Sequence, residues 1–122
     1  MKSNVMSGLT SFHAGLAAEE IVARHYVANG YRLLEQRWRG PVGEIDLILS
    51  RDGTTVFVEV KKAKSFESAA ARITSRQIIR VSQSAEGFLG GLPNGINSDA
   101  RMDVAVVDGF GAVRVLENVT IH

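Results

Sequence analysis

Three charged side chains in this sequence have the types and spacing that hydrolysis of a phosphate ester needs. Asp46 lies in one apolar stretch, and Glu59 and Lys61 lie two residues apart in the next. Carboxylate oxygens suit Mg²⁺ or Mn²⁺, and a lysine beside them can stabilise developing negative charge. Glu44 is a candidate supporting residue, either at this site or as the ion-pair partner of Lys61.

A β-hairpin would bring these side chains together. Residues 43–50 and 54–62 have the composition of strands, and they are joined through Asp52-Gly53. Asp-Gly between two apolar runs is a strong signal for a two-residue hairpin turn. Because the turn fixes the register, we expect Asp46 to lie opposite Glu59.

The two faces of this hairpin differ in character. Ile45, Leu47 and Leu49 point to one aliphatic face, whereas the other face carries the charges, with Glu44 opposite Lys61. That charged face could be solvated. However, directly opposed like charges destabilise a sheet, so the facing carboxylates favour a metal site over a plain surface.

A further acid lies on the first expected helix, residues 11–29. At about 100° per residue, one stripe of this helix consists of Phe12, Leu16, Glu19, Ala23, Tyr26 and Val27. Glu19 is near the centre of this apolar stripe, where an unpaired acid is costly. It either pairs with an arginine beneath the helix or reaches the charged face of the hairpin as a fourth site residue.

Basic residues gather on and just before a second expected helix, residues 68–89. Candidates for binding a phosphate backbone are Lys62, Lys64, Arg72, Arg76 and Arg80. The three arginines are spaced as one helix row, which is also typical of a solvated face. Gln77 lies at the edge of the apolar stripe, where it either faces the site as a supporting residue or is a hydrogen-bonded core amide.

The remaining elements are three strands, at residues 31–38, 101–108 and 112–116. The order α-β-β-β-α-β-β predicts an α/β (α+β) fold with a mixed β-sheet flanked by helices. Asp103, on the fourth strand, either supports the site or pairs with Arg101.

Composition limits the classes of protein that this chain can belong to. Its 122 residues are 45% hydrophobic and 22% charged, with a net charge of +1 and no cysteine. We expect a flexible N-terminus at residues 1–10 and a single domain at residues 11–122. The lack of a long apolar run argues against a membrane protein, so a cytoplasmic location is expected. The sequence leaves the oligomeric state open, a homodimer included.

Longer motifs give a specific resemblance. The acid on one strand and Glu-x-Lys on the next resemble the PD-(D/E)xK nuclease superfamily, whose fold is restriction-endonuclease-like. The longer sequence motifs resemble the YraN-like family of small bacterial proteins, itself similar to archaeal Holliday-junction resolvases. This resemblance covers about residues 12–107. The motifs that carry it are Gly15-x-x-Ala18-Glu19, Gly30-Tyr31, Gly43-Glu44-Ile45-Asp46-Leu47-Ile48, Phe57-Val58-Glu59-Val60-Lys61 and Arg101-Met102-Asp103-Val104.

The resemblance implies roles for individual residues. Asp46 and Glu59 would bind the metal, and Glu19, the acid contributed by the helix, would be a third ligand. Lys61 would orient or activate the attacking water. The chain departs from the family pattern at positions that would affect substrate binding more than metal binding. Ala63 replaces a usual arginine, a usual glycine near Glu67 is missing, and Arg76 replaces a usual lysine.

Two functional hypotheses follow. The first is a Mg²⁺-dependent DNA endonuclease that acts on branched or otherwise structured DNA. The second is a nucleic-acid-binding or interaction protein that keeps the nuclease fold without useful turnover. The set of Glu19, Asp46, Glu59 and Lys61 favours the enzyme, whereas the small net charge and Ala63 favour the binding protein.

Overall fold

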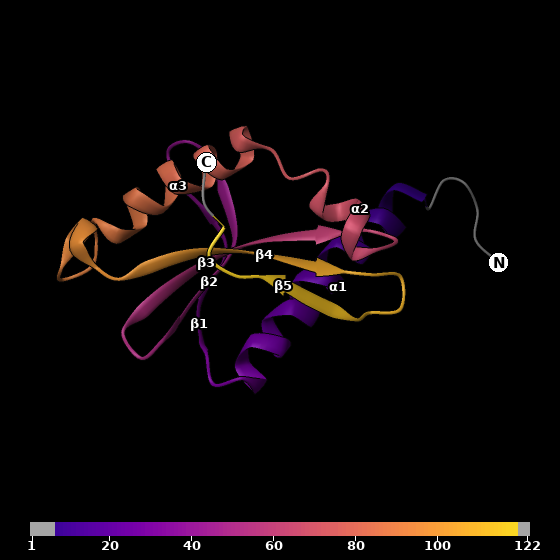
Figure 1. Cartoon of the computed structure of the whole chain (residues 1–122), viewed down its shortest axis with the longest axis horizontal. Coiled ribbons are helices and arrows are strands. Elements are labelled where there is room, and N and C mark those ends of the chain that lie inside the picture. Colours follow the sequence, from indigo (N-terminus) through magenta and orange to yellow (C-terminus); the bar gives the residue numbers. More distant parts are fainter. Residues whose placement is uncertain (1–6, 120–122) are drawn as a thin grey trace.

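The computed structural model of the chain describes residues 7–119, without the side chains of residues 7–16 and of residue 96. A single five-stranded sheet, in the order β1-β2-β3-β4-β5, separates α1 on one face from α2 and α3 on the other (Figure 1). The elements are α1 (Ser7–Ala28), β1 (Arg32–Arg39), β2 (Glu44–Arg51), β3 (Thr54–Lys62), α2 (Phe66–Ala70), α3 (Ser75–Leu89), η2 (Gly95–Asn97), β4 (Ala100–Val107) and β5 (Val113–Leu116).

The pairing of the strands makes the sheet mixed. The β1–β2, β2–β3 and β4–β5 pairs are antiparallel, and β3 and β4 are parallel. The parallel pair requires a crossover, which α2, α3 and η2 provide. This is the expected α+β, restriction-endonuclease-like architecture, and the expected strands agree with the observed ones to within one residue at each end.

The hairpin turn between β2 and β3 confirms its sequence signal. Asp52 and Gly53 both have positive φ angles, 52° and 84°, as a type I′ turn requires. Arg51 pairs with Thr54, and the ladder continues in that register as far as Leu47 opposite Val58.

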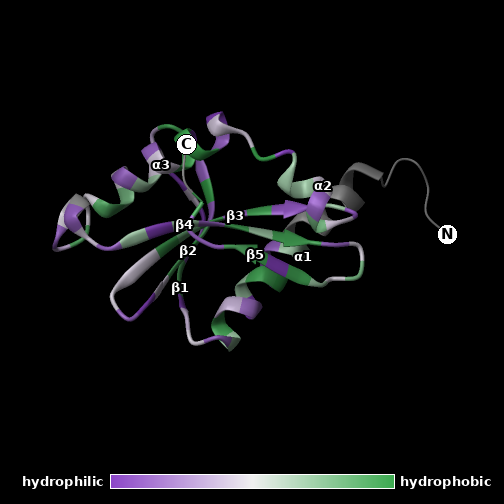
Figure 2. Cartoon of the chain, in the orientation of Figure 1, coloured by the Kyte–Doolittle hydropathy of each residue, from purple (hydrophilic) through white to green (hydrophobic). Residues whose placement is uncertain are grey.

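The hydrophobic core has two layers, one on each face of the sheet. Val22 and Tyr26 of α1 pack on Leu47, Leu49 and Val58. On the opposite face, the buried side chains of α3 pack on those of β2, β3 and β4. Figure 2 shows the hydrophobic segments concentrated in the central strands, between the helical layers. The central strands β2 and β3, which carry the candidate site residues, are therefore packed on both faces.

The first helix differs from the expectation in two ways. It begins at Ser7 rather than near Ser11, inside the segment expected to be flexible, while residues 1–6 lie outside the described residues. Its buried stripe runs through Ala18, Val22 and Tyr26, and Val27, expected in the stripe, is 52% exposed. The helix is therefore rotated about its axis relative to the predicted stripe.

The second expected helix, residues 68–89, was wrong as a single element. The structure has the short helix α2, a break, and then α3, which starts after the N-cap Thr74. Thr74 and Gln77 form a reciprocal capping box, the side-chain arrangement that marks a helix start in sequence as Ser/Thr-x-x-Glu/Gln. The signal was present, but the apolar periodicity on both sides masked it.

Between residues 7 and 119, no helix is both long and apolar enough to span a bilayer.

Candidate functional site

The candidate site lies where β2 and β3 separate. Their ladder ends at Leu47 opposite Val58. Beyond that pair, β2 continues alongside β1 as far as Glu44, and β3 continues alongside β4 as far as Lys62. The two strands thus form a fork, and Asp46 and Glu59 are the first residues beyond its base.

Asp46 closes the base of this fork with its side chain. The backbone N–H of Val60 donates to Asp46 Oδ2 at 2.8 Å, so a carboxylate oxygen accepts the bond that a strand carbonyl would otherwise accept. The alternation of β2 breaks at this residue, because Ile45 packs in the layer of α3 and not with Leu47 and Leu49 beside α1. The expectation of one aliphatic face for Ile45, Leu47 and Leu49 was therefore wrong at Ile45.

Glu59 is the buried acid of the site, with 7% of its surface exposed. It lies on the α3 face of the sheet, where Arg80 Nη2 is 3.1 Å and Lys61 Nζ is 3.7 Å from the same Oε2 atom. The pKa of Glu59 is nevertheless raised to about 7, first by burial and then by the charge of Asp46 and the hydrogen bond between the two carboxyl groups. Two cations thus compensate this carboxylate incompletely.

Glu19 approaches the same acids from α1. Its side chain is half-buried, at the flank of the helix stripe and not at its centre. Burial raises its pKa, and the negative charges of Asp46 and Glu44 raise it further, against the opposing effect of Arg37. Glu19 therefore lies close enough to Asp46 for their charges to interact.

The register extrapolated from the hairpin turn predicted that Glu44 lies opposite Lys61. This prediction was wrong. Glu44 stands opposite Arg39 in β1 and forms ion pairs with Arg37 at 3.7 Å and with Arg39 at 3.6 Å. The reason is the fork, which carries Glu44 away from β3. Arg37, which sequence reasoning missed, has a positive φ of 52° in its strand, and this irregularity could not be read from the residue type.

Arg80 reaches Glu59 over a glycine. A Cβ atom on Gly43 would lie 3.1 Å from Arg80 Cδ, so the absence of a side chain there makes room for the arginine stem. The hydroxyl of Ser84, one turn further along α3, donates to the Gly43 carbonyl at 3.2 Å. Arg80 Nε is buried and has no hydrogen-bond partner. The glycine of the Gly-Glu-Ile-Asp motif therefore serves the packing of α3 against the site.

Comparisons with known proteins place these residues in a family. A sequence model described as "Uncharacterised protein family UPF0102" matches residues 18–107. The chain belongs to this family. It is the YraN-like family of the resemblance above, and the match includes Glu19, Asp46, Glu59 and Lys61.

Individual UPF0102 proteins are similar to this chain over nearly their whole length. One from Roseobacter denitrificans is 52% identical over 116 residues, which cover 95% of this chain and 90% of that protein. One from Cereibacter sphaeroides is 48% identical, with 93% and 97% covered. One from Ruegeria pomeroyi is 43% identical, with 100% and 99% covered. Because the family is described as uncharacterised, these relatives establish kinship and leave the activity open.

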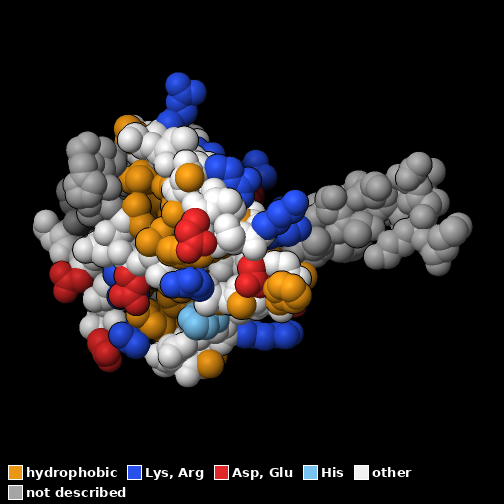
Figure 3. Space-filling view, turned by 45° about the vertical axis from the view of Figure 1, so that its right-hand side comes forward, with side chains coloured by type: hydrophobic (Ala, Val, Ile, Leu, Met, Phe, Trp, Pro, Cys, Tyr) orange, Lys and Arg blue, Asp and Glu red, His pale blue; other side chains and the backbone are white. Residues whose placement is uncertain are grey.

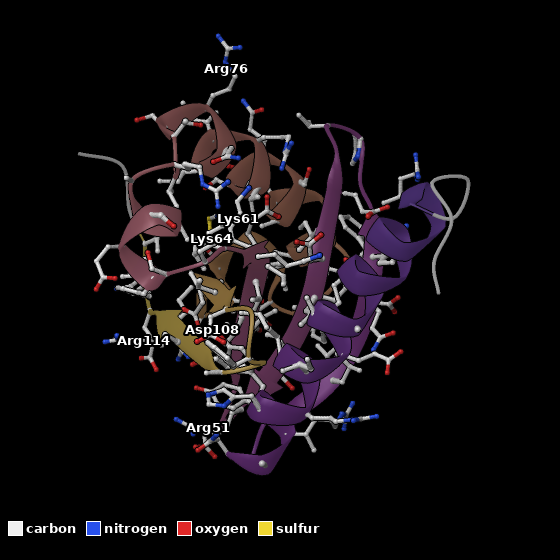
Figure 4. All side chains as sticks on the ribbon, turned by 90° about the vertical axis from the view of Figure 1, so that its right-hand side faces the viewer. Arg51, Lys61, Lys64, Arg76, Asp108 and Arg114 are labelled. Carbon is white, nitrogen blue, oxygen red and sulfur yellow. The ribbon has the colours of Figure 1, made fainter. Side chains whose placement is uncertain are left out.

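The basic residues of this UPF0102 chain do not form the expected helix row. Arg72 precedes the Thr74 cap and donates to the Lys62 and Ser68 carbonyls, whereas Arg80 turns inward to Glu59. Figure 4 shows Arg76 projecting away from the molecule, apart from Lys61 and Lys64. The row was wrong because the helix is broken between Arg72 and Arg76. On the face drawn in Figure 3, blue cationic side chains alternate with red acidic ones.

Gln77 is the N3 residue of the capping box. Its side-chain oxygen accepts the Thr74 N–H at 3.0 Å, and its own N–H donates to the Thr74 hydroxyl at 3.2 Å. Of the two readings left open by the sequence, a satisfied amide therefore fits better than a site residue, although it lies at a helix start and not in the core.

Asp103 lies on the opposite face of the sheet from Glu59. It is fully buried and accepts bonds from the Tyr26 hydroxyl at 2.7 Å, from Arg101, and from the Asn118 N–H at 3.0 Å. The pairing with Arg101 is thus the correct alternative, and Asp103 does not support the candidate site. Its partners tie α1 and the segment after β5 to β4.

The donor atoms of the fork suit a small divalent cation. Asp46 lies close enough to the buried Glu59 for its charge to raise the pKa of Glu59. Mg²⁺ commonly binds through one or two carboxylates and retains several waters. No group of three acidic or histidine side chains within the described part of the chain is arranged to hold a metal. The expectation of Glu19 as a third ligand is therefore not met, and Asp46 and Glu59 remain the candidate ligands.

Proposed function

We propose that this UPF0102 chain is a Mg²⁺- or Mn²⁺-dependent phosphodiesterase that hydrolyses DNA. The observation that carries the proposal is the pair of carboxyl groups, Asp46 and Glu59, at the fork, with Lys61 Nζ 3.7 Å from Glu59. In a structural ion pair the opposite charge normally stabilises the ionised acid. Here the pKa of Glu59 stays raised although Lys61 and Arg80 lie beside it. A perturbed acid beside a second acid and a lysine is typical of a functional site.

The residues of the chain divide the chemistry among them. When bound, a divalent ion supplies a Lewis acid and lowers the pKa of a coordinated water. Asp46 and Glu59 hold such an ion, and Glu19 adds negative charge from α1. Lys61, half-buried next to Glu59, presents an ammonium group that stabilises the negative charge developing on the phosphate.

Binding of the DNA backbone falls to cations outside the carboxyl pair. Lys62 and Lys64 are exposed immediately after Lys61, and Arg72 is fixed next to them through the Lys62 carbonyl at 3.1 Å. These three cations make a phosphate path that leads to the fork. Arg76 lies apart from them, so its contribution is expected to be small. DNA as substrate implies a cytoplasmic location.

A second function is favoured by one contact. Arg80 occupies Glu59 Oε2 at 3.1 Å, and its guanidinium supplies part of the positive charge that a metal would bring. If this ion pair persists with DNA bound, the chain is a DNA-binding protein that keeps the nuclease fold without turnover. The two functions differ in whether a divalent ion displaces Arg80 from Glu59.

The deciding experiment is a cleavage assay on linear duplex, single-stranded, flap and four-way DNA with Mg²⁺, Mn²⁺ or EDTA. We expect cleavage only with metal, and its loss in Lys61→Ala with DNA affinity largely retained, because the lysine acts on the transition state. Asp46→Asn should lose both cleavage and metal response.

Glu86→Gln is the matched control, since it removes an exposed acid of α3 away from the fork. It should cut like the wild type. If the wild type binds DNA and cuts none of these substrates with either metal, the enzyme proposal is wrong and the binding protein is the better account.

A further inference from the structure

A rigid turn at one end of the sheet holds an aromatic side chain in solvent. Phe110, between β4 and β5, is 98% exposed. The Asp108 carboxylate accepts the N–H groups of Phe110 at 2.8 Å and Ala112 at 3.0 Å. Gly111 completes the turn with a φ of 83° and donates its N–H to the Asp108 carbonyl at 3.1 Å. The exposed ring is therefore presented by a fixed backbone.

A groove with basic edges begins at the foot of this turn. One hollow of about 310 Å³ is lined by Lys62, Ala63, Lys64, Val107, Asp108 and Gly109. A second, of about 650 Å³, shares the Lys62–Lys64 segment and extends to Ser68 and Arg72. Two adjoining hollows with three cations on their edges have the charge that a phosphate backbone requires. The Asp108 carboxylate, the acid in this lining, is occupied with the turn hydrogen bonds.

The groove adjoins the candidate site through the end of β3. Lys62 directly follows Lys61 and pairs with Val107 of β4, and the Ala63 N–H donates to the Val107 carbonyl at 3.1 Å. The turn at residues 108–111 therefore emerges at the edge where β3 delivers Lys61. Figure 4 shows Lys61, Lys64 and Asp108 on the same end of the molecule.

We propose that this groove binds a single-stranded segment of DNA and that Phe110 stacks on an unpaired base of that segment. An exposed aromatic ring beside a cationic groove is the combination by which proteins bind single strands, with phosphates on the cations and bases on the ring. The bases of an intact duplex are already stacked on one another and do not offer this contact. The inference rests on the proposed function and narrows its substrate class to DNA with unpaired bases, such as single strands, flaps or branch points.

The test measures affinity without cleavage. Fluorescence anisotropy in EDTA compares a labelled oligothymidine with a blunt duplex, for the wild type and for Phe110→Ala, Phe110→Leu and Phe110→Tyr. Loss of one stacked base costs roughly 5- to 150-fold in affinity. We expect about a tenfold loss for the single strand in the Ala and Leu variants, near-wild-type affinity in the Tyr variant, and unchanged duplex affinity.

Two further variants sharpen the result. Val27→Ala removes another exposed apolar side chain, on α1, and should change nothing. Lys62→Gln combined with Lys64→Gln should flatten the salt dependence of single-strand binding, by up to about 0.7 slope units per lost contact. Circular dichroism of each variant checks that the fold is retained.

The outcomes separate this inference from the function on which it rests. If the wild type binds and cuts DNA but Phe110→Ala or Phe110→Leu binds the single strand normally, only the stacking inference is wrong. An equal loss for single strand and duplex also overturns it, as does self-association that depends on Phe110, because the ring would then contact a second copy. If the wild type neither binds nor cuts DNA, the proposed function fails too.

Discussion

The two faces of the sheet each bury a carboxylate, and the two are treated in opposite ways. Asp103 on β4 is fully buried and accepts four hydrogen bonds, two of them from the Arg101 guanidinium. Glu59 on β3 has Arg80 and Lys61 at its Oε2 atom, but it also has the carboxyl group of Asp46 beside it. Burial and the charge of Asp46 raise the pKa of Glu59 to about 7 despite these two cations.

This difference distinguishes an acid that stabilises the fold, Asp103, from an acid that is available for chemistry, Glu59. Asp103 has hydrogen-bond donors from α1, from its own strand and from the chain after β5, so it holds distant segments together. Glu59 lies at a fork where the sheet opens, beside a second acid, Asp46, which accepts the Val60 N–H. Two carboxylates close together in a partly closed place repel one another in the free protein, and a bound cation would relieve that repulsion.

The largest expected effect on stability comes from removing the Asp103 carboxylate. Asp103→Ala leaves Arg101 and the Tyr26 hydroxyl without their buried acceptor. Removing one partner of a buried ion pair costs about 3–5 kcal/mol, so the free energy of unfolding should fall by that amount. Urea unfolding with circular dichroism measures this, with exposed Asp99→Ala as control. A loss below about 1 kcal/mol would show that Asp103 is not the structural acid described here.

The pH dependence of stability tests the Glu59 side. Its pKa is about 7 in the folded protein against an ordinary value of 4.5, so between these values the folded state binds more protons than the unfolded state. The free energy of unfolding must then fall as the pH rises through this window, and the raised pKa of Glu19 acts in the same direction.

The expected loss between pH 4.5 and pH 7 is on the order of 2 kcal/mol, after allowance for solvent screening. Glu59→Gln should remove most of this dependence and melt no lower than the wild type at pH 8. Thermal melts across the pH range measure both. Equal pH slopes in the two proteins would contradict the account of Glu59.

A smaller effect is expected from moving Arg80 without changing any charge. In Gly43→Ala the new Cβ atom would lie 3.1 Å from Arg80 Cδ, so the arginine must shift relative to Glu59. We expect a loss of about 1 kcal/mol, larger at pH 8 than at pH 5 because only ionised Glu59 needs the arginine. Gly91→Ala is the matched control, since its Cβ meets its nearest atom at 3.5 Å. If the loss of unfolding free energy were the same at both pH values, the contact between Arg80 and Glu59 would not be the cause.

Local signals in the sequence predicted much of this arrangement. Asp52-Gly53 fixed the hairpin register, and the alternation of β3 placed Glu59 and Lys61 on one face. Asp103 alternates with Ala105 and Val107, and the structure places all three on the face beside α1. The capping box at Thr74 and Gln77 was also readable and would have separated Arg72 from Arg76.

Other features depend on tertiary geometry that no local pattern contains. The strands diverge at Asp46 because β2 stays with β1 while β3 stays with β4, and this moves Glu44 away from Lys61. The contact of Arg80 with Glu59 depends on how closely α3 approaches Gly43. The proximity of Asp46, Glu59 and Lys61 was therefore predictable, whereas the contacts of Glu44 with β1 and of Arg80 with Glu59 were not.

The central claim is that the fork is a divalent-cation site, and one measurement tests it most directly. The melting temperatures of the wild type and of Asp46→Asn are followed as Mn²⁺ is added at pH 8 without DNA. Ligand bound to the native state at 100 times its dissociation constant stabilises it by about 2.7 kcal/mol. The account predicts a rising melting temperature for the wild type and for Glu86→Gln, and none for Asp46→Asn. No rise in the wild type, or the same rise in Asp46→Asn, would contradict it.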